Sequence, residues 1–153
     1  MSNEDERGPL YERPKKASHL HTLWYEVDML DYCLQMLSAG AVRSKPEESV
    51  YLEGFLLHYR NVLRFLSGIG HRRSDLSTAE PKVWAGRVLT PEEVEQIQRP
   101  AVMLDSKYHA DISQYLQHCT VRRMEDEKQW NVSRMNLELQ AIIEAFQRSF
   151  PRP

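Results

Sequence analysis

Apolar residues recur at spacings of three and four in four long stretches of the chain. These stretches cover residues 18–37, 45–67, 101–123 and 129–150. Residues with this spacing lie on one face of a helix, so each stretch predicts an amphipathic helix with a buried side. No stretch alternates apolar and polar residues as a half-buried strand does.

Local signals mark the ends of these helices. Ser18 is a candidate cap for the first helix, which Ala39-Gly40 ends. Lys45-Pro46-Glu47-Glu48 places a proline and two acids in the first turn of the second helix. Thr90-Pro91-Glu92-Glu93 combines a cap, a proline and a capping-box glutamate, and predicts a short helix that Pro100 interrupts.

The expected fold is therefore all-α. We expect a four-helix up-and-down-type bundle with a short extra helix in the crossover between helices 2 and 3. Residues 1–17 are charged, contain two prolines and lack periodicity, so they predict a flexible N-terminal arm. Residues 18–150 then form a single helical-bundle domain.

The second helix is apolar over more than half of its circumference. At about 100° of rotation per residue, its first apolar stripe is Leu52, Leu56, Tyr59, Leu63 and Leu66, and its second is Tyr51, Phe55, Val62, Phe65 and Ile69. One stripe can pack inside the bundle, and the other needs a further cover. That cover is either the 70–100 segment or a second copy of the protein, and we favour a homodimer.

His58 lies in the second stripe of this helix, between Phe55 and Val62. Most buried histidines are neutral and hydrogen-bond to one neighbour, which is the simpler interpretation. The functional interpretation is an imidazole held in a desolvated cleft, where neighbouring groups tune its titration.

A row of polar residues follows the third long helix, at positions i, i+4, i+7 and i+11. The row consists of Asp111, Tyr115, His118 and Arg122. It is either the boundary between core and solvent, or a set of groups that binds phosphate and exchanges protons with a ribose hydroxyl. The second interpretation requires His118 and His58 to lie close together.

Composition narrows the class of protein. The chain has 153 residues, 41% of them hydrophobic and 27% charged, which is typical of one globular domain. Its net charge of −2 excludes a broadly basic surface and with it unspecific duplex binding. Cys33 and Cys119 lack CxxC spacing and predict free buried thiols. With no apolar run of membrane-spanning length and no signal-peptide pattern, we expect a cytoplasmic protein.

Several other chemistries find no support in the sequence. His109 and His118 are nine residues apart and fall on opposite sides of their helix, so we predict no metal site and no cofactor. Neither a Gly-x-Ser-x-Gly turn nor a glycine-rich phosphate loop is present. His71-Arg72-Arg73 with Trp84 is the best candidate for an RNA contact. The alternatives are a solvated loop with one anchoring tryptophan, or an anchor for a protein partner.

Two segments carry a resemblance to a known family. "EGFLLHYRNVLRFL" and "ADISQYLQHCTVRR", on either side of a Trp-containing loop, resemble uncharacterised bacterial helical proteins related to the HEPN domains. The shared residues are His58, Arg60 and Asn61 in the first segment and His118 and Arg122 in the second. The resemblance implies an all-α bundle that dimerises. Many HEPN domains are metal-independent ribonucleases of toxin–antitoxin and antiviral systems.

The HEPN active site has the pattern Arg-x(4–6)-His, and this chain departs from it. With His118 as the histidine, the arginine belongs at positions 111–113, which hold Asp111, Ile112 and Ser113. Arg60 or Arg122 is the candidate replacement. The resemblance therefore implies a HEPN-like binding or regulatory module in bacterial defence or stress response. The alternative is a metal-independent endoribonuclease that uses His118 and His58. The candidate binding residues are Arg60, Asn61, Asp111, Arg122 and Trp84.

Overall fold

The computed structural model of the protein describes residues 20–40, 43–72, 75–117 and 130–153. These residues form helices and loops, with no β-strand among them. The long helices are α1 (His21–Ser38), α2 (Lys45–Ser67), α5 (Arg99–Gln117) and α7 (Val132–Ser149), and the short ones are α3 (Lys82–Ala85), α4 (Pro91–Glu93) and the π-helix η1 (Val94–Gln98). The predicted all-α bundle is confirmed. The predicted arm, residues 1–17, lies outside the described residues.

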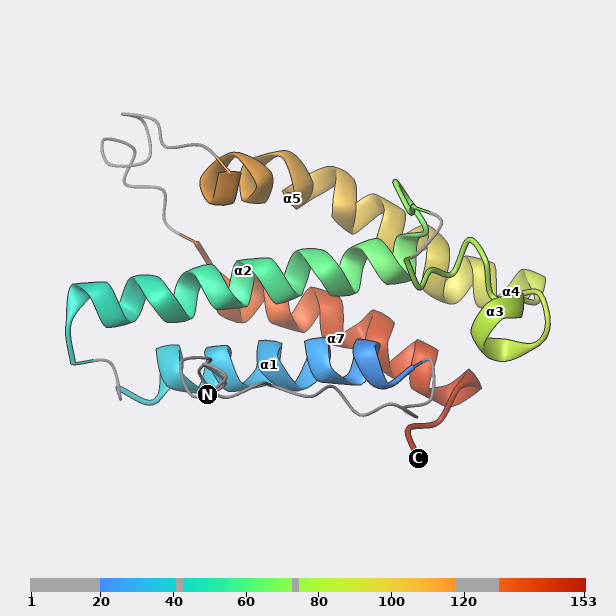
Figure 1. Ribbon diagram of the computed structural model, residues 1–153, viewed down its shortest axis with the longest axis horizontal. Helices are drawn as coiled ribbons and strands as arrows, with labels where there is room; N and C mark the ends of the chain where they lie inside the picture. Colours follow the sequence, from blue (N-terminus) through green and yellow to red (C-terminus); the bar gives the residue numbers. More distant parts are fainter. Residues whose placement is uncertain (1–19, 41–42, 73–74, 118–129) are drawn as a thin grey trace, which may run out of the picture.

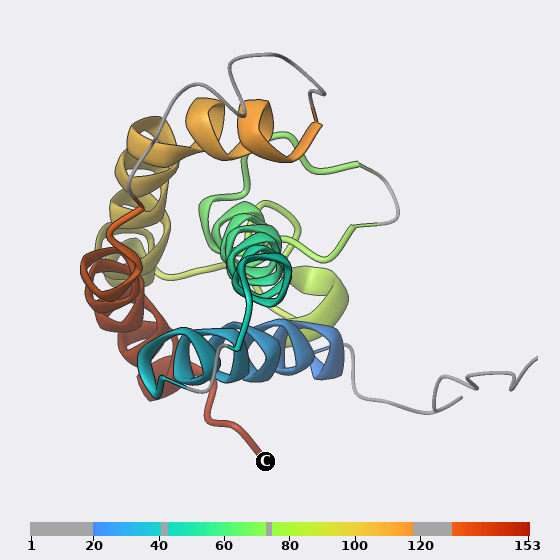
Figure 2. The same cartoon turned by 90° about the vertical axis from the view of Figure 1, so that its left-hand side faces the viewer.

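Helix α2 is the central helix of the bundle. Successive long helices run in opposite directions (Figure 1), and α1, α7 and α5 lie around α2 in the end-on view (Figure 2). The second apolar stripe of α2 is covered by the chain itself: Phe55 and Val62 are fully buried, and the ring of Trp84 lies 5.4 Å from that of Phe65. The reason for favouring a homodimer is thereby removed, and the homodimer stays a prediction.

The ends of α2 follow its local sequence. The Ser44 hydroxyl accepts a hydrogen bond from the Glu47 backbone N–H at 3.3 Å, which satisfies one free donor of the first turn. Gly68 ends the helix in the left-handed conformation with φ of +73°, which glycine adopts without steric cost. The predicted cap of α1, Ser18, lies outside the described residues.

The predicted helix break at Pro100 is wrong. α4, η1 and α5 follow one another without a gap from Pro91 to Gln117. A proline in a helix lacks an N–H and crowds the carbonyl four residues earlier, which here belongs to Gln96. Gln96 lies within η1, and the wider turn of a π-helix at this point gives the proline ring room. The helical path therefore continues through Pro100 instead of stopping.

The crossover between α2 and α5 is held to the bundle by an aromatic anchor and an ion pair. The indole N–H of Trp84 donates to the Ser77 carbonyl at 2.9 Å, and its ring packs against Phe150 at 4.8 Å between centroids. Arg87 donates two hydrogen bonds to Glu93, at 2.6 and 2.8 Å. This contact is the main reason that the pKa of Glu93 is lowered to about 2.

Among the described residues, none of the helices combines the length and the apolar character that crossing a membrane requires.

Candidate functional site

His58 is held by a glutamate of the neighbouring helix. Its Nδ1 lies 2.5 Å from Oε2 of Glu26 in α1, and the amide of Asn61 donates to the same oxygen at 3.1 Å. His58 is 9% exposed, and the ring of Tyr25 meets it edge-on at 6.0 Å. A polar residue thus fits within an apolar stripe because its partner stands opposite on α1. A hydrogen bond to one neighbour is what the simpler interpretation expects, and the catalytic role of His58 stays a prediction.

The predicted approach of His118 to His58 lies outside what the structure describes. His118 and Arg122 belong to residues 118–129, which are not among the described residues. Their candidate roles in catalysis and in binding phosphate therefore stay predictions. Asp111, from the same predicted row, is exposed on α5. Trp84 is partly buried and packs against the core.

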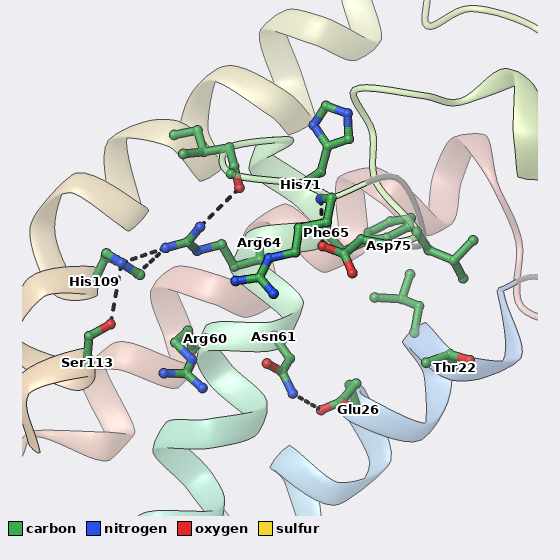
Figure 3. A pocket seen from close by; sticks show the side chains of 15 residues that line it. Thr22, Glu26, Arg60, Asn61, Arg64, Phe65, His71, Asp75, His109 and Ser113 are labelled. Atoms are coloured by element: carbon green, nitrogen blue, oxygen red, sulfur yellow. Dashed lines mark hydrogen bonds between the residues drawn. The ribbon is translucent and has the colours of Figure 1, made fainter. Parts of the chain in front are cut away.

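A cleft of about 870 Å³ opens between α1, α2, α5 and the turn that follows α2. Figure 3 shows Arg60, Asn61 and Arg64 on its α2 wall, with Glu26 and Thr22 on α1 and His109 and Ser113 on α5. The full set of lining residues is Thr22, Leu23, Glu26, Arg60, Asn61, Arg64, Phe65, Ile69, Gly70, His71, Arg72, Asp75, Leu76, His109 and Ser113. Three arginines thus face a cavity of the size that small ligands occupy.

Arg64 is fixed in this cleft by three contacts. Its Nη2 lies 2.6 Å from Nε2 of His109 and 3.1 Å from Nδ1, and its Nη1 donates to the Ile69 carbonyl at 3.4 Å. A Cβ on Gly70 would clash with the same Nη1, so a side chain at position 70 would require the guanidinium to move. The turn that ends α2 therefore also seats the guanidinium of Arg64.

Arg60 stands one helical turn before Arg64 and, unlike it, has no partner among the described residues. It is half-buried, and no described residue accepts a hydrogen bond from it or pairs with it. Burial lowers the pKa of Arg60, and the charge of Arg64 lowers it further. An arginine stays charged regardless. A half-buried cation next to a second cation is stabilised by any anion that enters the cleft.

Three polar residues of α5 stand at successive helical turns behind Arg64. Oδ1 of Asp105 lies 3.7 Å from Nδ1 of His109, and Oγ of Ser113 lies 3.4 Å from its Nε2. Asp105 is 6% exposed, and its Oδ1 has no hydrogen-bond partner among the described residues. Since a guanidinium only donates, the ring nitrogen that accepts from Arg64 must be unprotonated.

The sequence predicted some of the residues that line this cleft and did not predict others. Arg60, Asn61, His71 and Arg72, all of them candidates, line the cleft. Arg73 lies outside the described residues. His109 was considered only as a metal ligand, although Asp105, His109 and Ser113 form a row at i, i+4 and i+8 that helical spacing alone could have shown.

Comparison with protein-family models, with curated proteins and with solved structures finds no match. Among the described residues, no group of three or more histidine, cysteine, aspartate and glutamate side chains is arranged to hold a metal ion. The chemistry that the described cleft offers is that of guanidinium, imidazole, carboxylate, amide and hydroxyl groups.

Proposed function

We propose that the protein is a HEPN-like binding or regulatory module and that its cleft binds the phosphate groups of RNA. The observation that carries this proposal is the half-buried Arg60, which has no partner among the described residues and stands beside Arg64. A protein gains stability by pairing such a cation. Phosphate oxygens are strong acceptors for arginine.

The other lining residues support RNA more than an isolated anion. Arg72 adds a further guanidinium to the lining, and His71 adds an exposed ring. The two carboxylates of the cleft are engaged elsewhere: Glu26 accepts from His58 and Asn61, and Asp75 accepts from the backbone of Arg72 at 2.8 Å. Neither carboxylate pairs with the guanidinium of Arg60, and sequence-tolerant binding of a single strand is the expected mode.

Fluorescence anisotropy measures the binding of a labelled single-stranded RNA at a low and a high salt concentration, and this tests the proposal. Arg60→Ala is expected to raise the Kd about tenfold, which corresponds to about 1.4 kcal/mol, and to reduce its dependence on salt. Arg148→Ala is the matched control, because Arg148 is exposed on α7 and does not line the cleft. Equal effects of both substitutions would contradict a role for the cleft.

A metal-independent endoribonuclease is the second candidate function. One observation favours it: His109 lies in the cleft between Arg64 and Ser113, where an unprotonated imidazole can accept a proton. His58 is already engaged by Glu26, so His109 replaces it in this proposal, while His118 stays a candidate. Incubation of RNA in EDTA with the wild type, His109→Ala and His118→Ala decides between them. Cleavage lost in only one variant assigns the histidine, and intact RNA throughout supports the binding module.

A further inference from the structure

His109 has a charged group on either side of its ring. The guanidinium of Arg64 lies 2.6 Å from Nε2, and because a guanidinium only donates, a nitrogen that accepts from it carries no proton. The buried carboxylate of Asp105 lies 3.7 Å from Nδ1, on the same helix. The imidazole therefore stands between a cation and an anion.

An anion in the cleft would change this balance. Arg60 needs a partner, and a phosphate beside it also attracts the guanidinium of Arg64 on the next turn. Either the charge of Arg64 is then neutralised or its hydrogen bond to His109 is broken. Asp105 keeps its position in both cases, because it is buried within α5. The ring can then take up a proton and become a donor itself.

We propose that His109 is a further donor of the anion site, beside the arginines and available only when it is protonated, and that Asp105 is the residue that positions it. This inference rests on the proposed function, because it concerns the same cleft. Anion binding and proton uptake then favour each other. By reciprocity, the cleft binds an anion of constant charge more tightly as the pH falls.

Other charged groups face the cleft, and the test has to separate them. They are Glu26 from α1, Arg60 and Arg64 from α2, and His71, Arg72 and Asp75 from the turn after α2. Asp105 of α5 does not line the cleft and faces His109 from behind it. Of these, His71 is the only imidazole, and it lies exposed near Glu80 at 3.5 Å. His58 is engaged by Glu26 and does not line the cleft.

Sulfate is the probe, because its charge does not change in the range measured. The affinity of the full chain for sulfate is measured by calorimetry at pH 6 and pH 8, with chloride keeping the ionic strength constant. The wild type is expected to bind about fivefold or more tightly at pH 6. His109→Asn retains an acceptor for Arg64 but no titrating ring, so its affinity is expected to be equal at the two pH values.

Three further measurements keep the inference falsifiable. His71→Asn is expected to retain the wild-type ratio of affinities, and Asp105→Asn to reduce it. In ring-proton NMR spectra at pH 7, sulfate is expected to increase the protonated fraction of His109. If Asp105→Asn fails to fold, His109→Asn and the NMR measurement still decide.

The two proposals fail in different ways. If sulfate binds, Arg60→Ala weakens it and His109→Asn still shows the wild-type pH dependence, the role of His109 is wrong and the anion site stands. If sulfate binds at neither pH and Arg60→Ala has no effect on RNA, the proposed function itself is wrong.

Discussion

His58 and Arg60 stand two residues apart on helix α2, yet they have different surroundings. His58 faces α1 and meets Glu26 at 2.5 Å, while Asn61 completes the cluster at 3.1 Å. Arg60 faces the cleft, and no described residue pairs with it. The group of His58, Glu26 and Asn61 is closed, because its members are partners of one another, and it stabilises the contact between α1 and α2. Arg60 is an open group, because no described residue pairs with it, and it is stabilised only when an anion enters the cleft.

The largest effect on stability is expected from the removal of Glu26. Glu26→Ala leaves His58 and Asn61 without their shared acceptor in a largely buried position. The free energy of unfolding is expected to fall by about 2 kcal/mol, measured by urea denaturation. Glu144→Ala, at an exposed position of α7, is the control and is expected to change it by less than about 0.5 kcal/mol. A result for Glu26→Ala within the range of the control would show that the cluster is not closed.

A substitution at Gly70 tests how the open group is held. Gly70 has φ of +65°, and a Cβ there would clash with Nη1 of Arg64. Gly70→Ala is expected to lower stability by about 1 kcal/mol and to weaken RNA binding, because Arg64 must move. Gly86→Ala is the matched control: its φ is +69°, and a Cβ there would meet nothing within 4 Å. Gly86→Ala strains the backbone without touching Arg64, so it is expected to leave RNA binding unchanged. Equal weakening of RNA binding in both variants would show that Gly70→Ala does not act through Arg64.

The smallest effect on stability is expected at Arg60. Arg60→Ala removes a cation that pairs with no described residue and stands next to Arg64. The free energy of unfolding is expected to change by less than about 0.5 kcal/mol, or to rise as the repulsion between the two guanidiniums disappears. Denaturation of the same preparation that is used for RNA binding measures it. A loss of 2 kcal/mol would mean that Arg60 belongs to a closed group as well.

Helix positions and the class of fold were predictable because their signals are local. The observed bounds of α2, Lys45–Ser67, agree with the prediction, since a capping serine and Gly68 mark its ends. Pro100 misled the sequence reasoning, because a proline usually ends a helix and the π-helix before it is not written in any local pattern. The second apolar stripe of α2 pointed to a partner protein, although α1 and the crossover cover it.

The candidate site was predictable only in part. Arg60 and Asn61 were candidates because polar residues within an apolar helix are conspicuous in a sequence. His109 was missed because its importance comes from Arg64, which is 45 positions away in the chain. No periodicity connects two residues on different helices.

The sequence by itself determined that this chain forms long amphipathic helices, where α2 begins and ends, and which polar residues α2 carries. Only the tertiary structure decided that His58 is closed by Glu26 while Arg60 opens onto a cleft beside His109. The physical reason is the separation along the chain over which each interaction acts. Helix periodicity and capping act over a few residues along the chain, whereas pairing and burial depend on what another helix places opposite.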